Sequence, residues 1–215
     1  MTDQEKAPTL DDLVANRTMS KDIAATLRAT ARGRHSYLVV AIPRFAGKTT
    51  VMRAMLAHAP NGIPVQTVED DGTDVPRLLA ASRGGYIVVP EIARMMQHGY
   101  IWGAPVRKVF EGIGDGVSLA TALHAPSMEE AMGQITGDNG VPDEDAQKLE
   151  LVVYIRSLGA SVEHPDRRVI ATVHEIESVR GGRPKASLLH RWNEQSDRFE
   201  NVSDPKRIVT GRAVG

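Results

Sequence analysis

Residues 37–55 read YLVVAIPRFAGKTTVMRAM, and this stretch decides the fold class. Residues 36–42, SYLVVAI, form an unbroken and largely apolar run that is typical of a strand buried on both faces of a parallel sheet. The part that begins at Lys48 has the composition and spacing of a helix. Between the two lies a short loop with a single glycine, Gly47. The predicted order is therefore strand, loop, helix.

The loop carries half of a phosphate-binding signature. That signature is G-x-x-x-x-G-K-[ST], and residues 42–49 read IPRFAGKT, so an isoleucine stands in place of the first glycine. Ile42 resists the positive φ that glycine adopts, so the loop must turn differently there or leave part of its cradle incomplete. Lys48 can reach terminal phosphates, and Thr49 can offer a hydroxyl to magnesium.

The alternative is that AGKTT merely opens a helix. A buried-looking strand before it and a helix after it are the context that the signature requires, so we favour phosphate binding. The candidate nucleotide-binding residues are Pro43, Arg44, Phe45, Ala46, Gly47, Lys48, Thr49 and Thr50.

The alternation of strands and helices continues along the chain to about residue 135. Strands are predicted over 63–69, 86–90 and 116–123, and helices over 75–82, 91–110 and 127–135. This pattern predicts an α/β fold with a mostly parallel sheet flanked by helices on both faces, and ligands collect beyond the carboxyl ends of such strands.

The pattern changes after a polar break over residues 137–145. Four alternating segments follow, at 149–158, 167–179, 186–192 and 197–202, and we expect them to form antiparallel strands with RGGRP, residues 180–184, as a hairpin turn. The expected organisation is a flexible tail over 1–19 with one short helix, a single domain over 20–203 with its β-rich extension at 138–203, and a loose tail over 204–215.

Three polar residues at predicted strand ends are candidate catalytic residues. Glu91 could hold magnesium or orient an attacking water, or could simply be a favourable charge in the first turn of a helix. Glu69 could serve as a general base, although EDDGTD is an equally good solvated turn. His124 could sense a terminal phosphate, although a capping or packing role is the commoner one at such a position. Thr49 and Glu91 are the candidate magnesium residues.

Composition excludes several classes of protein. The 215 residues include no cysteine, which rules out disulfides, thiolate metal sites and a cysteine nucleophile, and fits a reducing cytoplasm. The acidic and polar start, MTDQEKAPTLDD, does not read as a secretory signal, and no apolar run approaches the roughly 18 residues of a membrane-spanning helix. A net charge of -1 and an aromatic content of 4% argue against a nucleic-acid motor, and the arginines of the last quarter suit a solvated sheet face.

Taken in order, these motifs resemble the motor domain of the type II and type IV secretion ATPases, which include pilus assembly and retraction motors. The resemblance rests on YLVVAIPRFAGKTTVMRAML, VQTVEDDGTD, YIVVPEIAR and GVSLATALHAPSMEEAM, followed by LVVYIR and RRVIATVHEIESV. In that family the first four are the Walker A loop, the Asp box, the Walker B segment and the His box. By position, residues 43–50 would be the phosphate loop, Glu69 the acid that activates water, Glu91 the acid near magnesium and His124 the His-box histidine.

The resemblance implies a P-loop NTPase that binds ATP and magnesium and hydrolyses ATP. It also implies a homo-oligomeric ring such as a hexamer, located in the cytoplasm and held at the inner membrane through secretion or pilus proteins. The chain departs from the family at Ile42 and Phe45, and LLAASRGG replaces an arginine-bearing segment, for which Arg77 or Arg83 could substitute. We expect no counterpart of the family's separate N-terminal domain in these residues. The alternative is a degenerate module of the same fold that binds nucleotide or joins an assembly without hydrolysis.

Overall fold

A computed structural model describes residues 7–42, 46–94, 97–159 and 165–208. Within these residues a nine-stranded sheet has the order β2-β3-β5-β1-β6-β7-β8-β9, with β4 paired to β3. The strands are β1 (Tyr37–Ile42), β2 (Val65–Thr67), β3 (Gly85–Ile92), β4 (Tyr100–Ile101), β5 (Val117–Leu123), β6 (Leu151–Leu158), β7 (Arg167–Arg180), β8 (Arg183–Asn193) and β9 (Arg198–Asn201).

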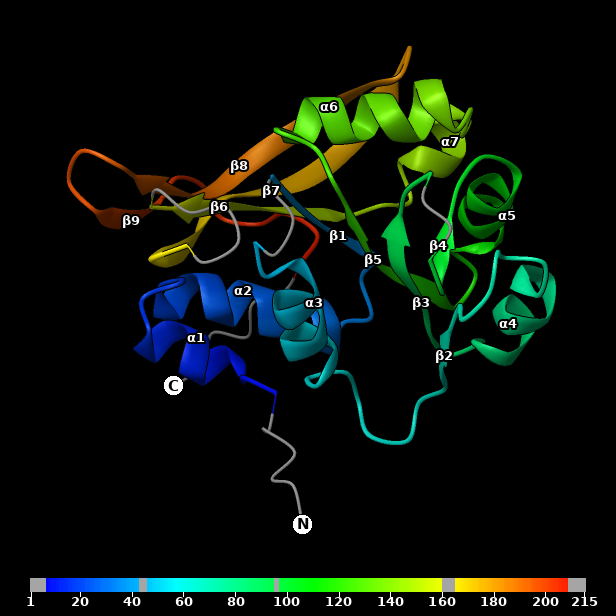
Figure 1. Ribbon diagram of the computed structural model, residues 1–215, viewed down its shortest axis with the longest axis horizontal. Coiled ribbons are helices and arrows are strands. Elements are labelled where there is room, and N and C mark those ends of the chain that lie inside the picture. The colour runs from blue at the N-terminus through cyan, green and yellow to red at the C-terminus, as the bar shows by residue number, and fades with distance from the viewer. Residues whose placement is uncertain (1–6, 43–45, 95–96, 160–164, 209–215) are drawn as a thin grey trace.

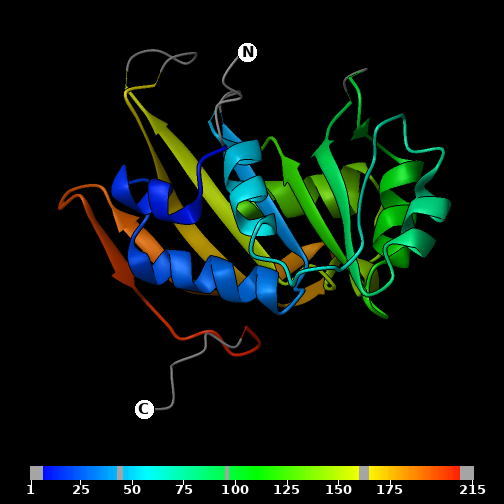
Figure 2. The ribbon, with the colours of Figure 1, turned by 90° about the horizontal axis from the view of Figure 1, so that it is seen from below.

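The helices lie on both faces of the sheet. They are α1 (Leu10–Ala15), α2 (Lys21–Arg32), α3 (Lys48–Leu56), α4 (Val75–Ala81), α5 (Ala104–Gly112), α6 (Met128–Gly133), the π-helix η1 (Gln134–Asp138) and α7 (Asp143–Ala146). Figure 1 shows α1, α2 and α3 on one face, α6 and α7 on the other, and α4 and α5 beside the β2 end. Seen from below in Figure 2, the helices α1, α2 and α3 lie in front of the sheet, and α2 runs across the strands that it covers.

Successive side chains of the central strand β1 point to opposite faces of the sheet, and the core consists of one cluster on each face. Leu38 and Val40 of β1 belong to the cluster that includes Phe110 of α5, whereas Val39 of β1 belongs to the cluster that includes Met55 of α3. Because both faces of β1 are covered, its sequence is apolar without interruption. The predicted α/β fold with a mostly parallel, helix-flanked sheet is confirmed.

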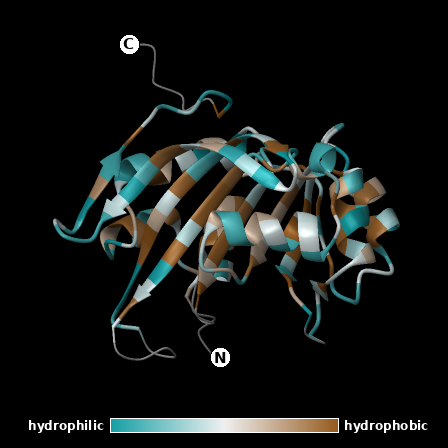
Figure 3. Ribbon diagram, turned by 90° about the horizontal axis from the view of Figure 1, so that it is seen from above, coloured by the Kyte–Doolittle hydropathy of each residue, from teal (hydrophilic) through white to brown (hydrophobic). Residues whose placement is uncertain are grey.

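The carboxyl-terminal strands behave differently. β7 pairs antiparallel with β6, β8 with β7, and β9 with β8. Hydrophobic and hydrophilic bands alternate along these strands in Figure 3, as expected for a sheet with one wetter face. The predicted hairpin turn is confirmed, because Arg180 pairs with Arg183 across Gly181 and Gly182, whose φ angles are 57° and 72°.

Two element predictions are wrong. The helix predicted over 91–110 is instead the end of β3, then β4, then α5 from Ala104. Gly99 and Gly103 have φ angles of 75° and 71°, which interrupt a helix, and Pro105 suits only a helix start. β6 was expected to be antiparallel only, but it also pairs in parallel with β1, and its Leu151–Val153 run is buried like that of a central strand.

Segments from both expected tails pack on the body. The side chain of Thr9 caps α1 through the backbone N–H of Asp12, and Leu10 and Leu13 are buried in the α3 cluster. At the other end, the fully buried carboxylate of Glu175 accepts backbone N–H groups from residues 206, 207 and 208 at 2.8, 2.9 and 3.0 Å. Among the helices of the described chain, none has the length and apolar character to cross a membrane.

Candidate functional site

The candidate site lies at the carboxyl edge of the parallel strands. The loop after β1 opens α3 there, His124 follows β5, Glu91 lies near the end of β3, and Glu69 follows β2. Because β2, β3, β5 and β1 are neighbours and run in parallel, these four segments share one edge. This is the edge at which open α/β sheets bind ligands.

The phosphate-type loop turns at Gly47 rather than at Ile42. Ile42 is the last residue of β1, paired with Arg156 of β6, and its side chain is exposed. The strand therefore continues through the position of the missing glycine. Gly47 is the N-cap of α3 with φ 92°, and as a glycine it has no side chain to cap the helix. The first N–H groups of α3 thus remain available to an anion.

Three of the predicted loop residues, Pro43, Arg44 and Phe45, lie outside the described residues. Their phosphate-binding roles therefore stay predictions. Of the others, Ala46 is buried, Thr49 is exposed and Thr50 is partly exposed. The exposed Thr49 is on the first turn of α3, as a magnesium ligand would need to be.

Lys48 and Glu91 form the most informative contact of the site. Lys48 is the first residue of α3, and its side chain is only 7% exposed. Its Nζ lies 3.3 Å from Oε1 of Glu91, whose side chain is 15% exposed. The pair joins the helix that follows β1 to β3, across the intervening strand β5.

An irregularity in β3 explains how Glu91 reaches Lys48. Val89 and Ile92 pack in the same cluster although they are three residues apart, which strict alternation does not allow. The register with β5 shifts between them, at Pro90, which has no N–H to donate. Glu91 therefore points to the opposite face, where α3 lies. The sequence alone does not reveal this shift.

The other two candidate catalytic residues lie at the same edge with different surroundings. His124 is partly exposed, and its backbone carbonyl accepts a hydrogen bond from Gln134 Nε2 at 3.1 Å. Glu69 is exposed, its backbone carbonyl accepts from His98 Nδ1 at 2.9 Å, and no described residue forms an ion pair with its carboxylate. The neighbouring Asp70 accepts the N–H of Gly72 at 2.8 Å, which makes that carboxylate a turn former.

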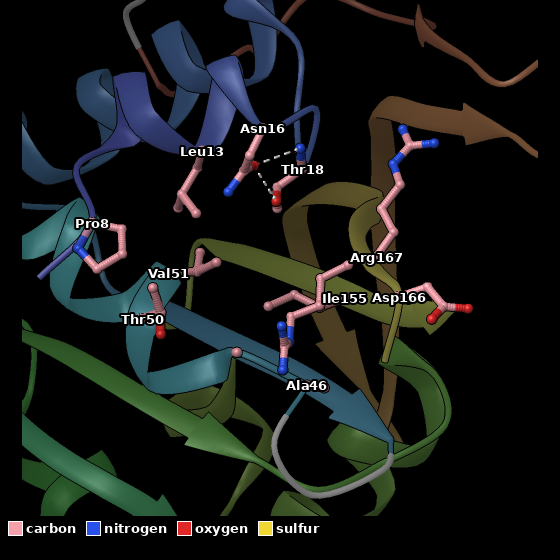
Figure 4. Close-up of a pocket in the computed structure, with 12 residues that line it drawn as sticks. Pro8, Leu13, Asn16, Thr18, Ala46, Thr50, Val51, Ile155, Asp166 and Arg167 are labelled. Atoms are coloured by element: carbon pink, nitrogen blue, oxygen red, sulfur yellow. Dashed lines mark hydrogen bonds between the residues drawn. The ribbon is translucent and has the colours of Figure 1, made fainter. Parts of the chain in front are cut away.

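A cavity of about 400 Å³ opens beside the loop (Figure 4). One wall is Leu13 with the polar end of α1, where Asn16 Oδ1 accepts from the N–H and the hydroxyl of Thr18 at 3.1 and 2.7 Å. The opposite walls are Gly47 and Thr50 on the loop side and Ile155, Arg167 and Arg168 on β6 and β7.

The sequence did not predict that the residues of α1, β6 and β7 line this cavity. The α1 residues fell in a segment expected to be a flexible tail, although Thr9 and Asp12 have the spacing of a capped helix start. Arg167 and Arg168 were interpreted as part of a solvated sheet face. Neither arginine expected to serve as a substitute is well placed: Arg77 pairs with Asp74 at 2.7 Å, and Arg83 comes just before the amino end of β3, at the opposite edge.

Magnesium suits the oxygen ligands that this edge offers. Among the described residues no cluster of three His, Cys, Asp or Glu side chains could hold a metal by itself. Magnesium keeps several waters and is usually held by one or two protein oxygens together with phosphate oxygens. Thr49 and Glu91 match that requirement in ligand type.

No family model and no curated protein matches the sequence. Two of the solved structures that match this chain are ATPases. The ATPase DotB of Legionella pneumophila shares 15% identity over 80% of this chain and 51% of that chain, with a TM-score of 0.55. The VirB11 ATPase of the Brucella suis type IV secretion system, solved in complex with sulphate, shares 18% identity over 78% of this chain and 57% of that chain, with a TM-score of 0.49. The chain thus spans about half the length of these proteins, and the likeness to DotB shows a shared fold.

Proposed function

We propose that this chain binds ATP with magnesium and hydrolyses it as the motor domain of a secretion- or pilus-type machine. The observation that carries the proposal is the contact at 3.3 Å between the buried Lys48, directly after Gly47, and the largely buried Glu91. A buried ion pair is on its own a poor source of stability, because both charges lose water. A pair of this kind at the ligand-binding edge is well explained if the phosphate of a bound nucleotide replaces Glu91 as the partner of Lys48.

Each residue has a defined part in this proposal. The free N–H groups at the start of α3 and the Lys48 ammonium bind the phosphates, and the Thr49 hydroxyl binds magnesium. Magnesium, when bound, neutralises charge that develops on the phosphate oxygens. Once Lys48 turns to phosphate, the Glu91 carboxylate is free to orient a water for attack. Glu69 and His124, at the same edge, are the further candidates for activating water and sensing the terminal phosphate.

The proposed setting is a homo-oligomeric ring, with a hexamer as the form that the motif resemblance implies. The ring would lie in the cytoplasm and reach the membrane through secretion or pilus proteins. The order of the motifs and the fold shared with an ATPase of known structure support this setting.

A second candidate function is a nucleotide-binding module that does not hydrolyse. Ile42 in place of the first glycine of the loop signature, and LLAASRGG in place of an arginine-bearing segment, favour it. Such a module would bind ATP through Lys48 but release no phosphate.

Phosphate release tests the two candidates. We expect turnover by the wild type, none by Lys48→Ala, and a loss of about 100-fold or more for Glu91→Gln with ATP binding retained. Glu200→Gln, which removes a partly exposed carboxylate on β9 far from the loop, is the control and should turn over ATP like the wild type. Equal turnover by the wild type and Lys48→Ala would contradict the proposal, and tight binding without turnover would select the second candidate.

A further inference from the structure

Arg168 of β7 lies directly against the residue that opens α3. A Cβ atom placed on Gly47 would be 3.2 Å from Cδ of Arg168 and 3.7 Å from its Nε. Arg168 also lines the 400 Å³ cavity together with Gly47 and Thr50. A guanidinium therefore stands beside the N–H groups at the start of α3.

The topology of the sheet explains this position. β6 is parallel to β1, and Arg156 of β6 pairs with Ile42, so the last residues of β6 extend past the end of β1. β7 is antiparallel to β6 and begins there, with Arg168 opposite Ser157. The amino end of β7 thus reaches the ligand edge. Arg168 shares a strand face with Ile170, which packs in the α3 cluster.

The preceding arginine has a different task. Nη1 of Arg167 lies 2.8 Å from Oδ1 of Asp197, and its Nη2 donates to the backbone carbonyl of Arg17 at 3.0 Å. Figure 4 shows Arg167 directed away from Ala46 and the loop. Arg167 therefore ties β7 to the N-terminal segment, and only Arg168 of the two contacts the loop.

On the basis of the proposed function, we propose that Arg168 is a further nucleotide-binding residue, which holds the phosphates from β7 of the same subunit. A guanidinium has five N–H donors, so it can keep a contact within the protein and still bind phosphate oxygens. With Lys48 on one side and Arg168 on the other, the phosphates would be bound between α3 and β7. The arginine that the family's segment supplies, where this chain has LLAASRGG, would thereby be replaced in cis.

Calorimetric titration with magnesium and ATP tests this role on the wild type, Arg168→Ala, Arg168→Lys and Lys48→Ala. Arg180→Ala removes an exposed arginine from the far end of the same strand and is the matched control. We expect the dissociation constant to rise about 10- to 100-fold for Arg168→Ala, as for the loss of one charged hydrogen-bonding group, to recover in part for Arg168→Lys, and to stay unchanged for Arg180→Ala.

Repeating the titrations at several salt concentrations separates phosphate binding from packing. Loss of a cation that binds phosphate makes the affinity less dependent on salt, whereas loss of a packing contact does not. Wild-type affinity in Arg168→Ala, while Lys48→Ala loses binding, would overturn this inference and leave the proposed function standing. A weakened Arg168→Ala with unchanged salt dependence and no recovery by lysine would also overturn it. Absence of binding in the folded wild type would overturn both.

Discussion

At the scale of single residues, the loop depends on one glycine. Gly47 has φ 92°, a conformation that costs an L-residue roughly 1–2 kcal/mol. Ile42 needs no such conformation, because β1 continues through it in extended form. The loop therefore keeps the glycine that its turn requires at residue 47 and accommodates isoleucine where the usual signature has its first glycine.

Gly47→Ala should lower the free energy of unfolding by about 1–2 kcal/mol from backbone strain, with a further loss because its Cβ would lie 3.2 Å from Arg168 Cδ. Urea denaturation measures the change. Gly62→Ala is the matched control, since Gly62 has φ 79° but, apart from its chain neighbours, no atom of the described residues lies within 4 Å of an added Cβ. The loss for Gly47→Ala should exceed that for Gly62→Ala. Equal losses of unfolding free energy in the two variants would show that Arg168 does not restrict the space for a side chain at residue 47.

At the scale of elements, β8 is joined to α2 and β9 through a buried histidine. His190 Nδ1 pairs with Asn201 Oδ1 at 2.9 Å, and its Nε2 lies 2.8 Å from Thr26 Oγ1. Burial lowers the pKa of His190 below its ordinary value of 6.5, against the opposing effects of Asn201 and the charge of Asp22. Burial likewise lowers the pKa of His174 on β7, opposed by Glu129.

Stability should therefore fall as the pH is lowered through about 6.5. Below that value the unfolded chain takes up protons at these histidines more readily than the folded chain, because their pKa values are lower in the fold. Urea denaturation between pH 7.5 and 5.5 should show this loss, and His190→Gln should reduce it. His98→Gln removes an exposed histidine and is the control. A loss of stability in His190→Gln as steep as in the wild type would contradict this assignment.

The elements also show what the sequence could predict. Continuous apolar runs and regular alternation correctly indicated β1, β3 and β5, because a strand that is buried on both faces consists almost entirely of apolar residues. The prediction of a helix over 91–110 was wrong because Gly99 and Gly103 adopt positive φ angles, which break a helix and which hydrophobic periodicity does not record. The parallel partner of β6 was missed because pairing with β1 is a long-range contact.

At the scale of the whole molecule, the site draws on segments from all along the chain. The motif placed Lys48 and Glu91 at one edge of the sheet, and the structure has them in contact. Arg168 and the α1 wall were not predictable in the same way, because they reach the loop only through the β6–β7 pairing and the docking of α1. The antiparallel extension thus contributes a residue, Arg168, to the candidate site.

The most direct test of the account is calorimetric binding of ATP with magnesium to the wild type and to Lys48→Ala. The account predicts saturable binding to the wild type and its loss in Lys48→Ala, with both proteins folded, because the lysine and the open start of α3 together hold the phosphates. Binding that survives in Lys48→Ala, or no binding to the folded wild type, would contradict it.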